Sequence, residues 1–165
     1  MQLPYLISVW IHIVAAAVWI GGAAFIAIAL VPAIRHPDHR QAAASLVHDI
    51  GTRFRSVGWV CLWAMLVTGI INIHYRYTWP AMSSGDFWSS PTGHALAVKI
   101  VLFGVILLAS GLHDFWLGPR ATALWQEMPD SEAARRLRRC ASWFGRINLL
   151  LGLILVALGV YLVRG

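Results

Sequence analysis

The amino-acid sequence predicts an all-α membrane protein, a bundle of four transmembrane helices. Its 165 residues are 59% hydrophobic and only 12% charged. The apolar residues gather in stretches at residues 5–31, 57–75, 94–117 and 144–163, each close to the ~20 residues with which a helix crosses a ~30 Å hydrocarbon core. No internal repeat or second domain interrupts this pattern, so we expect residues 1–165 to form a single domain.

The first apolar stretch is expected to be a retained membrane helix and not a cleaved signal peptide. No Lys or Arg precedes it, and it is much longer than the roughly 7–15 apolar residues of a signal sequence. One face carries His12, Ala16, Trp19 and Ala23 at the i+3 and i+4 spacing of a helix. The small residues on this face would let a neighbouring helix or a flat ligand approach closely.

The second and fourth stretches also present polar or small residues along one face each. The face of the second stretch carries Cys61, Met65, Thr68, Asn72 and Arg76. The face of the fourth carries Asn148, Gly152, Leu155 and Gly159. Cys61 would lie inside the bundle and Cys140 near a membrane surface, so we expect no disulfide bond between them.

Lys99, inside the third stretch, is the most informative single residue. An ammonium group at that depth costs about 2.5–3.5 kcal/mol on insertion scales, so it is expected to face the bundle interior and to have a function. Phe103, Ile106, Ser110 and His113 follow Lys99 at helical spacing and complete one face. Asp114, beside His113, would fix the tautomer of that ring or relay a proton.

Arginine distribution predicts the topology. Four crossings place both chain termini on one side of the membrane. Arginines are concentrated in the two connections on the other side, at Arg35, Arg40, Arg53, Arg55, Arg120, Arg135, Arg136, Arg138, Arg139 and Arg146. By the positive-inside rule these connections are cytoplasmic and the termini lie outside, in a bacterial-type inner membrane. The net charge of +6 thus reflects topology, and no nucleic-acid partner is expected. Residues 130–139 are predicted to form a short amphipathic helix on the cytoplasmic leaflet.

Histidines gather toward the predicted outer side. His12 and Lys99 each lie about seven residues into their helices, or ~10 Å below the outer boundary. His74 ends the second stretch and His94 begins the third, both close to the membrane surface. His94 is about 140° around the helix from Lys99, and His74 is expected to face lipid headgroups.

Two metal chemistries fit this outer layer. Haem b needs an axial His, apolar walls and cations for its carboxylates, which His12 and either Arg76 or Lys99 could supply. Lys99 could also ligate the iron as a neutral amine, or steer an anionic substrate as a cation. Copper would suit imidazole and thioether ligands. Those ligands would be His12, His74, His94, Met65 and Met82.

A copper transporter would pass the ion from that layer along Met65 and Cys61 to His113 and a loop with His36, His39 and His48. The cation at Lys99 would repel Cu⁺ on this path. A third reading, a structural subunit of a larger membrane complex, predicts no cofactor and tolerance of the substitution His12→Ala.

Four segments resemble the CopD superfamily, which groups copper-resistance D membrane domains with HemJ-type protoporphyrinogen oxidases. They are "WIHIVAAAVWIGGAAFIAIALVP", "RFRSVGWV" with "LVTGIINI", "HALAVKIVLFGVILLASGLHD" and "FGRINLLLGLILVALGVYLVRG". In HemJ-like proteins a His of the first helix and a Lys of the third form the functional pair, associated with b-type haem. His12 and Lys99 fall at these positions, and Asn148 lies in the matching "RIN" of the last helix.

Other positions are similar to the copper-resistance branch, for which copper uptake across the inner membrane is the implied role. At Leu149, Leu151 and residues 31–34 the chain departs from the HemJ pattern. The shorter "Pro…RF…TG.(I/L)N" pattern also lies closer to that branch.

The sequence therefore predicts a membrane haem b-binding redox protein that oxidises a porphyrinogen, a quinol or a similar small molecule, with copper binding or uptake as the alternative. Lys99 is the candidate catalytic residue. The candidate cofactor-binding residues are His12, Lys99, Arg76, Asn148, His74 and His113. The candidate metal ligands are His12, Lys99, His74 and His94. Expected partners are membrane lipid and a small redox substrate or copper ion, with homo-oligomerisation left open.

Overall fold

The computed structural model describes residues 3–34, 40–128 and 131–164, which are helical apart from short connections. Among these residues four helical segments are long and apolar enough to cross a membrane: Leu3–Ala33, Ser45–Arg76, Pro91–Glu127 and Glu132–Arg164. The prediction of an all-α bundle with four membrane helices is confirmed.

Two of the four segments contain a π-helical turn. The first runs through α1 (Leu3–Phe25), the π-helical Ile26–Leu30 and α2 (Val31–Ala33). The third runs through α6 (Pro91–Leu112), the π-helical His113–Leu117 and α7 (Gly118–Glu127). The second and fourth are the single helices α3 (Arg40–Arg76) and α8 (Glu132–Arg164).

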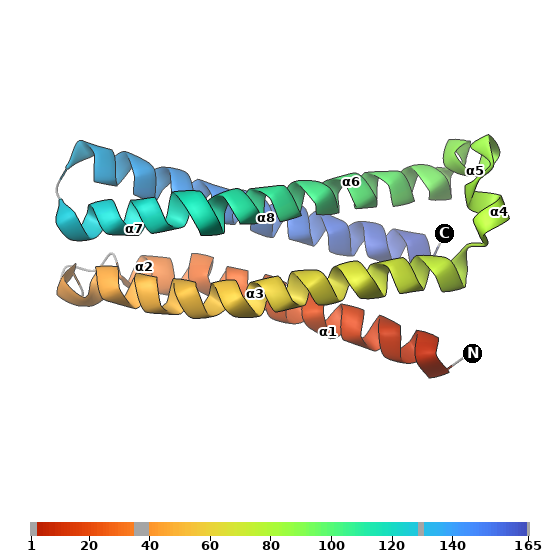
Figure 1. Cartoon of the computed structure of the whole chain (residues 1–165), viewed down its shortest axis with the longest axis horizontal. Coiled ribbons are helices and arrows are strands. Elements are labelled where there is room, and N and C mark those ends of the chain that lie inside the picture. The colour runs from red at the N-terminus through yellow and green to blue at the C-terminus, as the bar shows by residue number, and fades with distance from the viewer. Residues whose placement is uncertain (1–2, 35–39, 129–130, 165) are drawn as a thin grey trace.

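The bundle has two chemically different ends. Both termini lie at one end, here called the terminal end, together with the short helices α4 (Trp79–Met82) and α5 (Gly85–Ser89) (Figure 1). The opposite end holds α2, α7 and the first turns of α8 (Figure 1). It is called the arginine-rich end, because Arg53, Arg55, Arg120 and the arginines from 135 to 146 lie there. Which side of the membrane each end faces stays a prediction.

The helices pack in two pairs, α1 with α3 and α6 with α8, and α1 also contacts α8. The buried core contains Trp19 and Leu62, and Ile106 on α6. Trp19 fits because Gly152 of α8 lacks a side chain: a Cβ there would lie 2.9 Å from Trp19 Cζ3. Most other large apolar side chains are exposed, as expected where lipid is the solvent.

The polar and small faces predicted for the spans point inward. Thr68 on α3, Ser110 on α6, and Asn148 and Gly152 on α8 are all buried. Cys61 is a buried free thiol and Cys140 an exposed one, which confirms the prediction that they form no disulfide.

The predicted surface helix at residues 130–139 is wrong. Residues from Glu132 onward form the first turns of α8, continuous with the membrane span, while Asp130 lies outside the described residues. Ser131 caps this helix, since its Oγ accepts a hydrogen bond from Ala134 N at 3.1 Å. No Pro or other helix breaker follows before the apolar stretch, so the helix continues through both parts.

Candidate functional site

His12 is held by a threonine of the neighbouring helix. It lies half-buried on α1, with Nδ1 2.8 Å from Thr68 Oγ1 of α3. The Thr68 hydroxyl donates its single proton to the Ala64 carbonyl one turn earlier, at 2.6 Å. Because that proton is committed, Oγ1 accepts a hydrogen bond from His12, so the proton of the ring lies on Nδ1.

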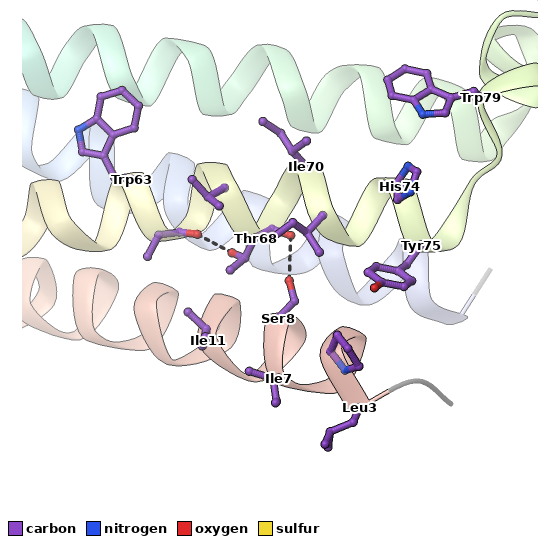
Figure 2. Close-up of a pocket in the computed structure, with 14 residues that line it drawn as sticks. Leu3, Ile7, Ser8, Ile11, Trp63, Thr68, Ile70, His74, Tyr75 and Trp79 are labelled. Carbon is purple, nitrogen blue, oxygen red and sulfur yellow. Dashed lines mark hydrogen bonds between the residues drawn. The ribbon is translucent and has the colours of Figure 1, made fainter.

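With Nδ1 on Thr68, Nε2 is the other ring nitrogen of His12, and the ring also interacts with the backbone carbonyl of Met65 on α3. Ser8, one turn before His12, donates from Oγ to the Thr68 carbonyl at 3.4 Å, which joins the two helices a second time (Figure 2). A histidine whose Nδ1–H is fixed by a neighbour presents Nε2 as a ligand in a defined direction.

Lys99 lies close to His12, as their matched depths predict. It is half-buried on α6 and near enough to the His12 ring for the two groups to interact electrostatically. On α8, a Cβ at Gly159 would lie 3.3 Å from Lys99 Nζ. No carboxylate of the described chain forms an ion pair with Lys99. The site thus draws His12, Thr68, Lys99 and Gly159 from four different helices.

Arg76 is occupied elsewhere. Its guanidinium donates a hydrogen bond to the Leu162 carbonyl near the end of α8 and lies 6.0 Å from the centre of the Tyr77 ring. A cation that binds the last carbonyls of a helix stabilises that helix end. Arg76 therefore ties α3 to α8 at the terminal end.

His74 and His94 do not join His12. His74 is exposed, with its ring 6.0 Å from that of Tyr75 and 6.4 Å from that of Trp79. It is six residues, or about 9 Å along the helix, from Thr68. His94 is exposed in the first turn of α6. Within the part of the chain that the structure describes, no three His, Cys, Asp or Glu side chains are placed to hold a metal ion.

An apolar groove of about 980 Å³ runs between α1 and α3 at the terminal end. Figure 2 shows Ser8 and Thr68 beside it, with His74, Tyr75 and Trp79 toward its outer end. The groove thus reaches the hydroxyl that orients His12.

His113 and Asn148 lie toward the arginine-rich end, away from Lys99 along α6 and α8. His113 Nδ1 is 2.9 Å from Asp114 Oδ1, and Asn148 Nδ2 donates to Ser110 Oγ at 3.0 Å. The pairing of His113 with Asp114 agrees with the prediction from the sequence. The loop histidines His36 and His39 lie outside the described residues, and His48 is exposed.

Sequence reasoning found Asp114 as the partner of His113 but missed Thr68 as the partner of His12 and the groups that hold Asp114. Thr68 was placed on the correct face, but nothing marked its hydroxyl as the group that orients His12. Trp59 Nε1 donates to Asp114 Oδ2 at 3.0 Å, and Arg55 Nη1 donates to the Asp114 carbonyl at 3.1 Å. Asp114 is 55 residues from Trp59 and 59 residues from Arg55 in the sequence, and no sequence pattern predicts contacts at such separations.

Comparison with known proteins identifies the family. The sequence profile of the copper resistance protein D family, CopD, matches residues 48–162. A protein of Aquifex aeolicus (strain VF5), described as an uncharacterized protein, is 32% identical over 152 residues, which cover 92% of this chain and 90% of that protein. No solved structure matches. The chain, with its four membrane-spanning helices, therefore belongs to the CopD family.

Proposed function

We propose that this CopD-family membrane protein binds haem b through His12 and acts as a redox protein on a small substrate. The single observation that carries the proposal is the hydrogen-bonded chain from Ala64 through Thr68 to His12 Nδ1. An outer partner of this kind fixes the tautomer and ring orientation of metal-binding histidines.

The residues around His12 would fit, in their chemistry, a haem held by this histidine. Gly69 lies against the edge of the ring, where a Cβ would be 3.6 Å from His12 Cε1. Gly159 leaves the same kind of space beside Lys99 Nζ. Bare backbone at these two positions allows a flat group to approach the ring and the amine. Haem b, when bound, supplies one-electron transfer.

Lys99 is the proposed substrate or cofactor partner. An ammonium with no carboxylate beside it in the described chain is suited to an external anion, and a carboxylate of a porphyrin or the oxygen of a quinone provides such a group. The alternative role for Lys99 is ligation of the iron as a neutral amine. In both roles it acts beside His12, whereas Arg76 serves the helix end.

Copper binding is the second candidate, and the sulfur atoms of α3 favour it. Met65 and Cys61 are buried on the face of Thr68, one and two turns further into the bundle. These soft ligands suit Cu⁺. The name of the CopD family points the same way. Against it, His74 and His94 are remote from His12, so the ligand set predicted from the sequence is dispersed.

The test is an absorption spectrum of the detergent-purified protein, oxidised and after dithionite, with metal content measured on the same sample. We expect a reduced b-type haem spectrum in the wild type and in His94→Ala, the matched control at an exposed histidine. His12→Ala is expected to lose the spectrum while keeping its helical circular dichroism. A colourless, folded wild type that contains copper would replace the haem proposal with the copper one.

A further inference from the structure

His113 and Asp114 form a second ordered cluster at the arginine-rich end. The carboxylate accepts two hydrogen bonds, from His113 Nδ1 at 2.9 Å on Oδ1 and from Trp59 Nε1 at 3.0 Å on Oδ2. Arg55 of α3 holds the backbone carbonyl of Asp114 at 3.1 Å. The pair is partly exposed, with 33% of the His113 side chain and 22% of the Asp114 side chain accessible. The pair therefore lies at the surface of the bundle, close to the end of the apolar stretch at residue 117.

The hydrogen bonds define where the protons lie. An indole nitrogen can only donate, so Asp114 Oδ2 is an acceptor. When Asp114 is ionised, Oδ1 is an acceptor too, and the proton of this hydrogen bond then lies on His113 Nδ1. His113 Nε2 is then the atom that gains or loses a proton. A carboxylate that orients a histidine in this manner is the usual support of a general acid–base group.

A π-helical turn creates this geometry. His113–Leu117 is π-helical, and the Gly118 amide donates to the His113 carbonyl, five residues earlier. The wider turn adds one residue to the helix, and such turns are frequent at functional sites. Here the turn contains both His113 and Asp114, and Asp114 contacts Trp59 of α3.

The other charged groups around the pair are cations. They are Arg55 on α3, with its guanidinium 5.9 Å from the Phe115 ring, Arg120 on α7, 4.4 Å from the Trp116 ring, and Arg146 on α8, two residues before Asn148. Residues 26–34 of the first span carry no charge. Asp49 lies six residues, or ~9 Å, before Arg55 on α3. Glu127 lies ~21 Å from His113 along the third span. Asp114 is thus the carboxylate that serves His113.

Two polar side chains, Ser110 and Asn148, follow the pair toward the interior of the bundle. Ser110, one turn before His113, accepts a hydrogen bond from Asn148. Asn148 is only 8% exposed, yet its Oδ1 is buried with no hydrogen-bond partner in the described structure. A buried acceptor of this kind is normally satisfied by water or by a ligand. Phe103 and Ile106 then separate Ser110 from Lys99, which is ~16 Å away along α6.

We propose that His113 and Asp114 form a proton-exchange site on the arginine-rich side of the membrane, with Ser110 and Asn148 as its first step into the bundle. The Nε2 lone pair takes a proton from a hydronium ion, which leaves water. The imidazolium, stabilised by Asp114, passes that proton to the next acceptor inward and returns to the neutral ring. No electron moves in this step. The inference deepens the proposed redox function, for which it supplies charge-compensating protons, but the site itself does not depend on haem.

The first experiment needs no cofactor. The protein is labelled with ¹⁵N-histidine in lipid nanodiscs, and the His113 signals are identified by their loss in His113→Gln. We expect the neutral ring to carry its proton on Nδ1, and Asp114→Ala to redistribute that proton toward Nε2. A wild-type ring protonated on Nε2, or a tautomer unaffected by Asp114→Ala, would overturn the proposal.

The second experiment follows proton uptake from unbuffered solution with a pH indicator after flash photoreduction of the bound haem. We expect His113→Gln to slow the uptake by about 100-fold, with the haem spectrum unchanged. Asn148→Leu should slow it as well, and His94→Gln should match the wild type. Equal uptake in His113→Gln and wild type would contradict the proposal. A wild type without haem would count against the proposed function only, and the NMR experiment would then decide the proton site.

Discussion

The two ends of the bundle each hold one histidine oriented through Nδ1, but the partners differ. At the terminal end His12 is held by the neutral hydroxyl of Thr68 at 2.8 Å. Lys99, which forms no ion pair with a carboxylate among the described residues, lies within electrostatic range of His12. At the arginine-rich end His113 is held by the carboxylate of Asp114 at 2.9 Å, inside a group of arginines.

The difference separates two kinds of chemistry. A hydroxyl fixes the direction of the ring without adding charge, so the His12 site keeps its positive character for a ligand or substrate that enters it. A carboxylate stabilises an imidazolium, so the His113 site is suited to carry a proton. The proposed haem site thus lies at the terminal end and the proposed proton-exchange site at the other.

The largest effects are expected when one charged side chain at each end of the bundle is replaced by an apolar one. Lys99→Met removes a cation that has no carboxylate partner in the described structure, and we expect it to stabilise the membrane fold by about 2.5–3.5 kcal/mol. Asp114→Leu leaves the donors of His113 and Trp59 unpaired, and we expect it to destabilise the fold by about 1–3 kcal/mol. Unfolding in mixed micelles with rising sodium dodecyl sulfate measures both.

The two substitutions are therefore expected to change the stability of the fold in opposite directions. If Lys99→Met destabilised the protein as strongly as Asp114→Leu, Lys99 would be a structural partner in the bundle, and its proposed role toward an external ligand would be wrong.

A smaller effect is expected on cofactor affinity. Thr68→Val removes the acceptor of His12 Nδ1 while conserving the shape of the side chain, so haem affinity should fall by about 10–100-fold. Asp114→Ala removes the corresponding acceptor at the other end and should leave haem affinity unchanged. Titration of haem into the apoprotein measures both constants, and a loss of equal size in the two variants would show that the ends are not specialised.

Glycines of α8 provide a third contrast, between a position that faces a rigid ring and one that faces a flexible side chain. At Gly152 a Cβ would lie 2.9 Å from the buried ring of Trp19, and at Gly159 it would lie 3.3 Å from the flexible end of Lys99. Gly152→Ala is expected to destabilise the protein by about 1–3 kcal/mol, because a rigid ring must move. Gly159→Ala should be neutral or stabilising by up to about 1 kcal/mol, since Ala favours helix. Thermal unfolding of both variants in detergent would reveal a reversed order, which would contradict the packing described here.

Most of the fold was predictable because a membrane permits few structures. Backbone groups in lipid must be satisfied within a helix, so hydropathy alone located the four spans. Helical spacing then placed Thr68, Ser110 and Asn148 on inward faces, and equal depth in the first and third spans, which run parallel, brought His12 within electrostatic range of Lys99.

The rest depends on details that spacing does not encode. Whether the Thr68 hydroxyl meets His12 or another group is set by the rotation of α1 against α3. Trp59 contacts Asp114 within the π-helical turn at 113–117, and the composition of the sequence does not predict that turn. Residues 132–139 have the charge pattern of a surface helix, yet their continuity with the span makes them part of α8.

The most direct test of the central claim, that His12 is the axial ligand of a haem, is chemical rescue. His12→Gly removes the ring and leaves space for a free imidazole molecule beside Thr68. We predict that the purified variant loses the reduced b-type spectrum and regains it when imidazole and haem are added together, while Thr68→Val in the same background weakens the rescue. Retention of the full spectrum by His12→Gly without imidazole would contradict the account.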